Sequence, residues 1–267
     1  MSAPATTTAR DGDRVSELLR TFNLTTAAEE LVPRLVGEGI VAALPVVAEV
    51  LEGEAEARHQ RRVDRLRRAS KLPPAKTFET FDDKRLSATL RHKLDELCAG
   101  AFLADGINVL AFGLPGVGKS HALAALGHRL VQAGHSVLFT ATYQIVQELL
   151  AAKRDLELPR KLRKLDHYEL VVLDDIGYVQ QSGEEAEVLF TLLAERYERR
   201  STAITSNLVF SDWDRIFKNT MATTAAIDRL VHHSVILEFD VTSYRTEKAK
   251  TAADDARPAK RNRSSNR

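Results

Sequence analysis

The 267-residue chain has a single cysteine, a single tryptophan and few aromatic residues, which make up 6% of the sequence. One cysteine, Cys98, cannot close a disulfide within the chain, and we expect it to be a small buried hydrophobic residue. Apolar runs such as 109–112 and 170–173 have the length of strands, far short of the roughly 18 residues of a membrane span. The opening MSAPATTTARDGDR also lacks the apolar core of a secretory signal. We therefore expect a cytoplasmic protein that does not cross a membrane.

An excess of charge of one sign is also lacking, because 38 Lys and Arg residues face 37 Asp and Glu residues, for a net charge of +1. The bases are nevertheless segregated: residues 58–71 carry +6, residues 153–164 carry +4 and residues 245–267 carry +5. Runs of this kind suit a phosphate backbone, although each also fits a solvated helix face or tail. Because no aromatic residues lie among the bases, double-stranded DNA is favoured over stacking on single strands. The predicted DNA contacts are Arg58, Arg61, Arg62, Arg65, Arg68, Lys161, Arg163 and Lys164.

The pattern along the chain predicts a small helical domain followed by a larger domain. Val15, Leu18, Leu19 and Phe22 repeat at helical spacing, and a second helix is predicted over about 41–68. Two prolines break the pattern at LPPAKTFETFD. The predicted organisation is a disordered N-terminus (1–14), a helical DNA- or partner-binding domain (15–71), a linker (72–85), a larger domain (86–247) and a basic, disordered tail (248–267).

From about residue 86 short apolar strands alternate with helical segments. This alternation is typical of an α/β domain with a parallel sheet and crossover helices. The five predicted strands are Asn108–Phe112, Ser136–Thr140, Leu170–Leu173, Thr202–Thr205 and Val235–Glu238. The fold class is therefore α/β, with a five-stranded parallel sheet.

A phosphate-binding loop follows the first predicted strand, because Gly113–Ser120 reads G-x-x-x-x-G-K-S and a helix comes directly after it. Glycines let the backbone amides surround phosphate groups, and the helix N-terminus adds partial positive charge. Lys119 supplies a charge to the outer phosphates, and the Ser120 hydroxyl is a ligand for Mg²⁺. The predicted nucleotide-binding residues are Gly113, Pro115, Gly116, Val117, Gly118, Lys119, Ser120 and His121. The predicted cofactors are ATP and Mg²⁺.

Polar residues follow two further predicted strands. Asp174 and Asp175 end the strand LVVL, where Asp174 would hold Mg²⁺ and Asp175 would orient or deprotonate the attacking water. Asn207 follows the strand 202–205, and the carboxyl ends of parallel strands meet at one sheet edge. We therefore expect Asn207 to position the water, although it also fits a simple helix cap.

These motifs together resemble AAA+ ATPases, and over about 15–247 the chain is similar to the IstB-type helper ATPases of insertion-sequence transposition, relatives of the helicase loader DnaC. The resemblance is carried by GLPGVGKSH, LVVLDDIG, LLAERYERRS, TSNLVFSDW and DRLVHH. It implies that ATP lies between the subunits of a homo-oligomer and that Arg229 completes the neighbour's site as a catalytic arginine. For His232 and His233 we favour a role at a helix end over metal binding, since no third ligand is evident.

The resemblance implies an ATP-dependent regulator of transposition that assembles on target DNA, recruits its transposase and hydrolyses ATP. Two departures bear on this function. Asp175 stands where many relatives carry Glu, which puts fast hydrolysis in doubt, and the residues after the last strand are too few for a C-terminal lid. Arg245 of SYR could take part of the task of the lid's sensor arginine. The alternatives are a helicase loader and a nucleotide-gated DNA scaffold with little hydrolysis; a small-molecule kinase is disfavoured, since no acceptor pocket is evident.

Overall fold

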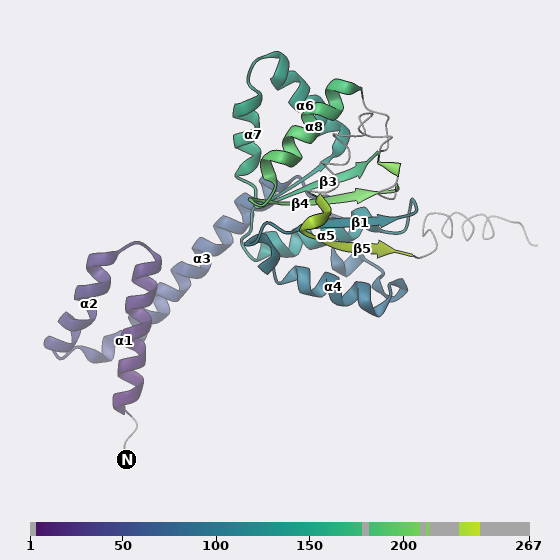
Figure 1. Ribbon diagram of the computed structural model, residues 1–267. Coiled ribbons are helices and arrows are strands. Elements are labelled where there is room, and N and C mark those ends of the chain that lie inside the picture. Colours follow the sequence, from purple (N-terminus) through teal and green to yellow (C-terminus); the bar gives the residue numbers. More distant parts are fainter. Residues whose placement is uncertain (1–3, 178–181, 209–211, 214–229, 241–267) are drawn as a thin grey trace, which may run out of the picture. The chain divides into compact units, whose positions relative to one another are not determined.

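The computed structural model describes residues 4–177, 182–208, 212–213 and 230–240 (Figure 1). The chain divides into two units, Met1–Arg65 and Leu66–Arg267. The dividing line falls within one long helix, α3 (Leu44–Ser70).

The N-terminal unit is helical. It contains α1 (Pro4–Thr21), α2 (Thr25–Gly37), the short 3₁₀ helix η1 (Val41–Ala43) and most of α3. The predicted apolar face of the first helical segment is confirmed, because Val15, Leu18, Leu19 and Phe22 are all buried. The hydrophobic core of this unit, around Val15, Leu19 and Leu44, joins the three helices.

The first helix begins earlier than the sequence analysis predicted. Residues 1–14 were expected to be disordered, yet α1 starts at Pro4, where proline is well tolerated because the first helical turn needs no amide donor. Gly12 lies within this added part and faces α2, since a Cβ at Gly12 would lie only 3.0 Å from Val32 Cγ1. Close packing of the two helices thus favours helix over coil in this segment.

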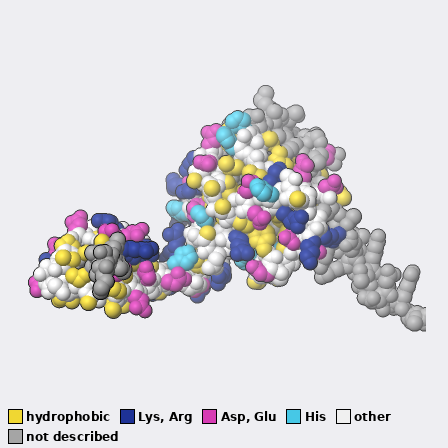
Figure 2. Space-filling view, turned by 90° about the horizontal axis from the view of Figure 1, so that it is seen from below, with side chains coloured by type: hydrophobic (Ala, Val, Ile, Leu, Met, Phe, Trp, Pro, Cys, Tyr) yellow, Lys and Arg dark blue, Asp and Glu magenta, His cyan; other side chains and the backbone are white. Residues whose placement is uncertain are grey.

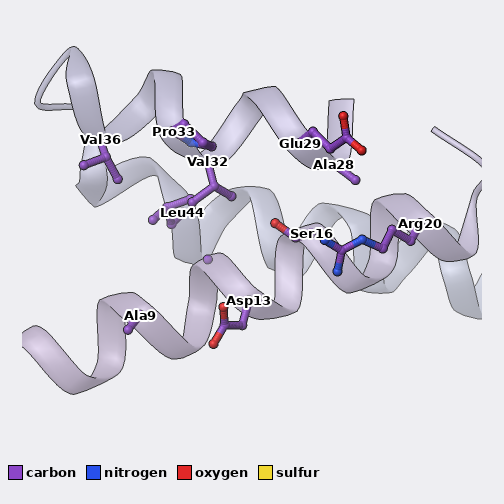
Figure 3. Close-up of a pocket in the computed structure, with 11 residues that line it drawn as sticks. Ala9, Asp13, Ser16, Arg20, Ala28, Glu29, Val32, Pro33, Val36 and Leu44 are labelled. Atoms are coloured by element: carbon purple, nitrogen blue, oxygen red, sulfur yellow. The ribbon is translucent and has the colours of Figure 1, made fainter. Parts of the chain in front are cut away.

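An open groove of about 880 Å³ runs between α1 and α2 in this unit (Figure 3). Asp13, Ser16 and Arg20 line it from α1, and Glu29 and Val32 line it from α2. Figure 2 shows hydrophobic side chains on the surface of the same unit. The exposed hydrophobic residues of this unit include Val36, Ile40, Val46 and Val50, each more than half exposed.

The second unit contains the predicted five-stranded parallel sheet, which confirms the fold class. Its strands are β1 (Asn108–Gly113), β2 (Val137–Ala141), β3 (Leu170–Ile176), β4 (Ser201–Ser206) and β5 (Ser234–Phe239). Their order in the sheet is β2-β3-β4-β1-β5, and every neighbouring pair is parallel. The carboxyl ends of β1, β3 and β4 therefore lie next to one another.

Helices cover both faces of this sheet (Figure 1). On one face α6 (Thr142–Arg154), α7 (Leu158–Asp166) and α8 (Gly183–Arg196) share a core with alternate strand residues such as Leu110, Val171 and Ile204. On the other face α5 (Lys119–Gln132) packs against four strands and α4 (Ala88–Cys98) packs against β5. The described part of this unit also contains the short 3₁₀ helices η2 (Phe78–Thr80), η3 (Asp83–Arg85) and η4 (Ala101–Leu103), and residues 230–232 before β5 are helical. Strands β1 to β4 bury side chains on both faces, as parallel strands with crossover helices do. The edge strand β5 buries Leu237 and Phe239 but exposes Glu238.

The segment 72–85, expected to be a linker, packs against α5 over part of its length. Leu72 is buried, and a Cβ at Gly127 would lie 2.7 Å from Leu72 Cδ2. His128 Nε2 lies 3.0 Å from the Pro73 carbonyl oxygen. The segment thus forms part of the larger unit.

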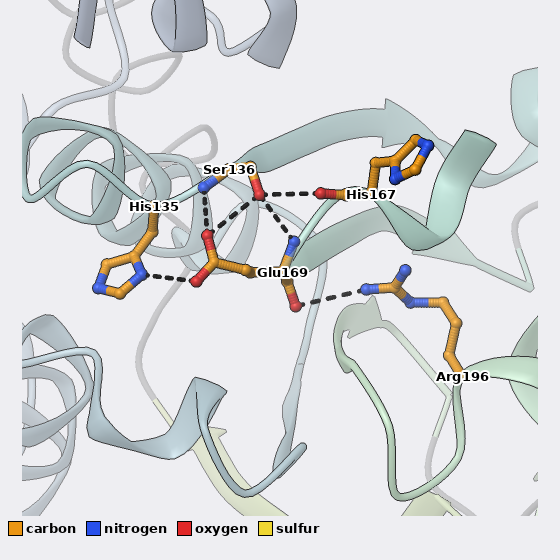
Figure 4. A network of polar contacts seen from close by, with 5 residues as sticks. All are labelled: His135, Ser136, His167, Glu169 and Arg196. Atoms are coloured by element: carbon orange, nitrogen blue, oxygen red, sulfur yellow. Dashed lines mark hydrogen bonds and ion pairs between the residues drawn. The ribbon is translucent and has the colours of Figure 1, made fainter. Parts of the chain in front are cut away.

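A polar network fills the amino edge of the sheet, at the ends of the strands opposite the phosphate loop (Figure 4). The Glu169 carboxylate accepts hydrogen bonds from the Ser136 backbone amide at 2.8 Å and from His135 Nδ1 at 2.9 Å. Burial raises the pKa of Glu169, but these hydrogen bonds outweigh it and leave the pKa below its usual value.

Arg196 lies in the same network and is only 2% exposed. Its guanidinium donates to the carbonyl oxygens of Leu165 at 3.0 Å, Tyr168 at 3.0 Å and Ser201 at 2.8 Å. Burial lowers the pKa of Arg196 to about 10. The side chain thus remains a cation at neutral pH and joins the end of α7 and its connection to β3 to the start of β4.

None of the described helices is long and apolar enough to cross a membrane. Cys98 is half-buried rather than buried, and burial together with Asp95 raises the pKa of its thiol.

Candidate nucleotide-binding site

The phosphate loop connects the carboxyl end of β1 to the first turn of α5. Its glycines adopt backbone angles that other residues rarely take: φ is +148° at Gly113 and +104° at Gly118. A Cβ at Gly113 would lie 2.5 Å from the Phe239 carbonyl oxygen, so only glycine fits between β1 and β5. The loop thus leads directly to a helix N-terminus whose amides and dipole favour a phosphate anion.

Of the predicted loop residues, Val117 and Lys119 are buried, Pro115 is exposed, and Gly116 and Ser120 lie between these extremes. Lys119 Nζ donates to the carbonyl oxygens of Gly113 at 2.7 Å and Leu114 at 2.8 Å, and to Asn207 Oδ1 at 2.7 Å. An ammonium group has three donors. A phosphate oxygen that bonds to Lys119 would therefore take the place of one of these acceptors.

The carboxylates and the amide lie together, as predicted for the carboxyl edge of a parallel sheet. Asn207 Nδ2 donates to Asp175 Oδ1 at 2.9 Å, while its oxygen accepts from Lys119. Asn207 thereby connects the phosphate loop of β1 to the acidic pair of β3.

Thr205, a site residue that the sequence analysis missed, connects both acidic residues to β4. Its hydroxyl donates to Asp174 Oδ1 at 2.7 Å and accepts from the Asp175 backbone amide at 2.7 Å. The residue is 1% exposed. A threonine within the strand pattern gave no separate signal, and only its place directly before Ser206 and Asn207 could have indicated it.

The backbone of Asp175 has φ of +63°, in the left-handed region. The register between β3 and β4 shifts between Leu173 and Ile176, which is the sign of a bulge. Bulges re-aim side chains at the ends of strands. Here the bulge lets adjacent residues, Asp174 and Asp175, both present their carboxylates to the same sheet edge.

His121, the last predicted residue of the loop, binds the segment before the sheet. Its Nε2 lies 2.9 Å from the Thr77 carbonyl oxygen and 3.2 Å from Thr80 Oγ1. Its ring lies 5.0 Å from that of Phe81, which also comes within 3.0 Å of a Cβ built at Gly118. Residues 77–81 therefore form one wall beside the phosphate loop, which the sequence analysis did not foresee.

Two predicted arginines, Arg229 and Arg245, lie outside the described residues. The predicted Mg²⁺ ligands Ser120 and Asp174 stand on α5 and β3 at the same sheet edge. Hydroxyl and carboxylate oxygens are the donors that Mg²⁺ prefers, so the residues present fit this ion.

The predicted DNA-binding residues on α3 share one side of that helix. At about 100° per residue, Arg61, Arg65 and Arg68 span an arc of about 60°, and Arg58 and Arg62 widen it to about 120°. Arg58 and Arg61 both bind Glu54 Oε1, at 2.7 and 3.0 Å. The three remaining arginines are exposed, and the described residues include no ion pair to them.

On α7 the predicted residues differ from one another. Arg163 and Lys164 are exposed, whereas Lys161 turns toward α6, where Glu148 Oε2 lies 2.5 Å from its Nζ. This contact is the first cause of the lowered pKa of Glu148. Lys161 thus ties α7 to α6, which leaves Arg163 and Lys164 as the available bases.

The second unit has the fold of AAA+ ATP-binding proteins. Those proteins share this strand order, with a phosphate loop after β1, acidic residues after β3 and a polar residue after β4. The chain belongs to the family of IstB-like ATP binding proteins, whose family model matches residues 15–252.

An insertion-sequence ATP-binding protein of Sinorhizobium fredii is 44% identical over 204 residues, covering 76% of this chain and 68% of the relative. The ATP-binding protein of insertion sequence IS21 from Pseudomonas aeruginosa is 39% identical, covering 76% of each chain. The crystal structure of the DnaC helicase loader is similar in fold, with a TM-score of 0.56 at 18% identity, and the match covers 62% of this chain and 98% of DnaC.

Proposed function

We propose that this protein is an ATP-dependent regulator of DNA transposition, which assembles on double-stranded target DNA and recruits and stimulates its transposase. The observation that carries the proposal is the connected site at the carboxyl edge of the sheet. There Asn207 joins Lys119 of the phosphate loop to Asp175. Membership of the IstB-like family and the similarity to insertion-sequence ATP-binding proteins support the transposition context.

The residues of the site divide the work of Mg²⁺-dependent ATP hydrolysis. Ser120 and Asp174 would hold Mg²⁺, which neutralises charge on the phosphate oxygens. Lys119 and the amides of the phosphate loop bind the phosphates. Asp175 orients and accepts a proton from the attacking water, and Asn207 fixes the Asp175 carboxylate for that task.

Completion of the site by a second subunit explains why nucleotide binding would control assembly. We propose that Arg229 of a neighbouring copy stabilises the charge that develops on the transferred phosphoryl group, as arginine fingers do. ATP would then favour a homo-oligomer, and hydrolysis would release it.

The exposed arginine face of α3 is the proposed contact with the DNA backbone. Arg62, Arg65 and Arg68 are exposed there. On the second unit Arg163 and Lys164 of α7 add exposed positive charge. Contacts to phosphates alone predict binding that is independent of sequence and strongly dependent on salt.

The proposal is tested by the mass of complexes formed with duplex DNA, Mg²⁺ and a slowly hydrolysed ATP analogue. We expect nucleotide-dependent multimers for the wild type and none for Lys119→Ala. Arg229→Ala should bind nucleotide as a monomer but assemble and hydrolyse poorly. A wild-type protein that remains a single subunit on DNA would overturn the proposal.

The DNA surface is tested separately with a variant that replaces Arg62, Arg65 and Arg68 by Gln. Loss of three phosphate contacts should reduce the slope of log K against log salt by about 3. The matched control replaces Arg20, Arg34 and Arg91, which are exposed elsewhere, and removes the same charge. Equal slopes for the two variants would contradict the assignment.

The alternative functions give different outcomes in these assays. A nucleotide-gated scaffold should form the same complexes but show no DNA-stimulated phosphate release. A helicase loader should retain a replicative helicase, rather than the transposase, when purified as bait with both present.

A further inference from the structure

A cluster of metal-ligating side chains lies at the amino edge of the sheet. Glu198 follows the end of α8, while His232 and His233 directly precede β5. The ligand atoms of these exposed residues all lie within 4.8 Å of one another. His233 Nε2 and Glu198 Oε1 are 3.6 Å apart, and the two imidazole rings meet edge to face, 4.5 Å between centroids.

The sequence analysis considered His232 and His233 for metal binding and favoured a helix-end role, because no third ligand was evident. The fold supplies that ligand. Glu198 is distant in sequence, but β1 lies between β4 and β5, so the loop before β4 and the segment before β5 both reach the amino end of β1.

The backbone holds both ligand-bearing segments against the residues that lead into β1. The His233 carbonyl oxygen accepts a hydrogen bond from the Asn108 backbone amide at 2.8 Å. Gly106 packs against the Glu198 loop so closely that a Cβ at Gly106 would lie 3.2 Å from the Glu198 carbonyl carbon. Glu198 itself has φ of +55°, a conformation that is uncommon for a residue other than glycine. The three side chains are thus brought together by anchored backbone.

We propose that Glu198, His232 and His233 bind a divalent transition-metal ion of the zinc class. Two imidazoles and one carboxylate are a ligand set that zinc takes, with a fourth position left for water. Bonds of about 2.0–2.1 Å at tetrahedral angles place two ligand atoms about 3.3 Å apart, close to the 3.6 Å between His233 and Glu198. Small rotations of exposed side chains complete the geometry.

The proposed metal site is separate from the Mg²⁺ site. β1 runs for six residues between its amino end, beside His233, and the phosphate loop, a distance of about 16 Å. The ion would join the loop between α8 and β4 to the start of β5, and so fix two connections of the ATPase unit.

The test is titration of tag-free, full-length protein with Zn²⁺ in the absence of nucleotide and Mg²⁺. We expect one ion per chain, and at least a roughly tenfold loss of affinity for Glu198→Gln, His232→Ala and His233→Ala, since each removes a ligand. The matched control is His92→Ala with Glu96→Gln, an exposed His–Glu pair 3.4 Å apart on α4. The control and Lys119→Ala should bind Zn²⁺ as the wild type does.

A second measurement separates ligand loss from misfolding. Trp213, the single tryptophan, is fully buried in the ATPase unit, so its fluorescence reports unfolding of that unit. Without metal the three variants should unfold at the wild-type midpoint, and Zn²⁺ should raise the midpoint of the wild type and the control alone. The proposal is wrong if Glu198→Gln retains wild-type affinity, or if the control variant loses affinity as much as the ligand variants do.

Discussion

Thr205→Val is the substitution that most directly tests the architecture of the nucleotide site. Valine has nearly the shape of threonine, so the change removes a buried hydroxyl without opening a large cavity. Two hydrogen bonds of 2.7 Å are lost, one to the Asp174 carboxylate and one from the Asp175 amide. A hydrogen bond to a charged group contributes about 1.5–3 kcal/mol, and an unsatisfied buried amide costs about 1–3 kcal/mol.

Replacement by a methyl group recovers part of this loss, because valine is easier to bury than threonine. We therefore expect the second unit to lose about 2–4 kcal/mol of unfolding free energy. Denaturant titration followed by the fluorescence of Trp213 measures this quantity for the second unit, since that residue is fully buried there. Thr205→Ser, which keeps the hydroxyl, is the control and should lose much less.

The same variant should also need a higher concentration of Mg²⁺ for nucleotide binding. Without the Thr205 hydroxyl, the Asp174 carboxylate is no longer fixed at the sheet edge, and orientation of ligands contributes strongly to metal affinity. The concentration of Mg²⁺ at half-maximal nucleotide binding should rise about tenfold or more for Thr205→Val. If valine leaves both stability and the Mg²⁺ requirement unchanged, Thr205 does not position the acidic pair.

Two further predictions concern the amino edge of the sheet. Arg196→Met should cost about 2–5 kcal/mol of unfolding free energy, because several buried carbonyl oxygens lose their hydrogen-bond donor. This loss outweighs the gain from no longer burying a charged group, whose pKa burial lowers to about 10. A denaturation midpoint at or above that of the wild type would refute this prediction. The lowered pKa of Glu169 means that its ionised form stabilises the fold above the unfolded-state pKa. The stability gap between wild type and Glu169→Gln should therefore stay constant from about pH 6 to 8 and shrink as pH falls below about 4.5; a gap that widens in acid would contradict the assignment.

Most of the sheet could be predicted from the sequence, because short apolar runs alternate with helical segments. The predicted strand 136–140 differs from β2 by one residue at each end, and the strand 170–173 extends to Ile176 in β3. The meeting of Asp175 and Asn207 could also be predicted, since parallel strands bring their carboxyl ends to one edge. The hydrophobic periodicity and the direction of the strands are thus sufficient to predict the site residues that directly follow strands.

Residues whose role depends on tertiary contact could not be found in this way. Thr205 has the side chain of an ordinary strand residue, and only the neighbouring β3 gives its hydroxyl two partners. The prolines before Phe81 indicate a linker, yet hydrogen bonds between His121 Nε2 and the Thr77 carbonyl oxygen and Thr80 hydroxyl bind that segment to the phosphate loop. In both cases the interacting residues are far apart in sequence, so no local sequence pattern predicts their contact.

The two edges of the sheet favour ions of opposite charge, because the helices that flank the sheet begin at one edge and end at the other. At the carboxyl edge α5 begins directly after the phosphate loop, and helix N-termini attract anions. At the amino edge α7 and α8 end, where the Leu165 carbonyl oxygen of α7 accepts from Arg196 and the Glu195 carbonyl oxygen of α8 accepts from Arg199. Helix C-termini favour cations, so an anionic ligand at one edge and a cation at the other follow from the same parallel architecture. Glu198, two residues beyond the end of α8, stands where that preference would assist a bound metal ion.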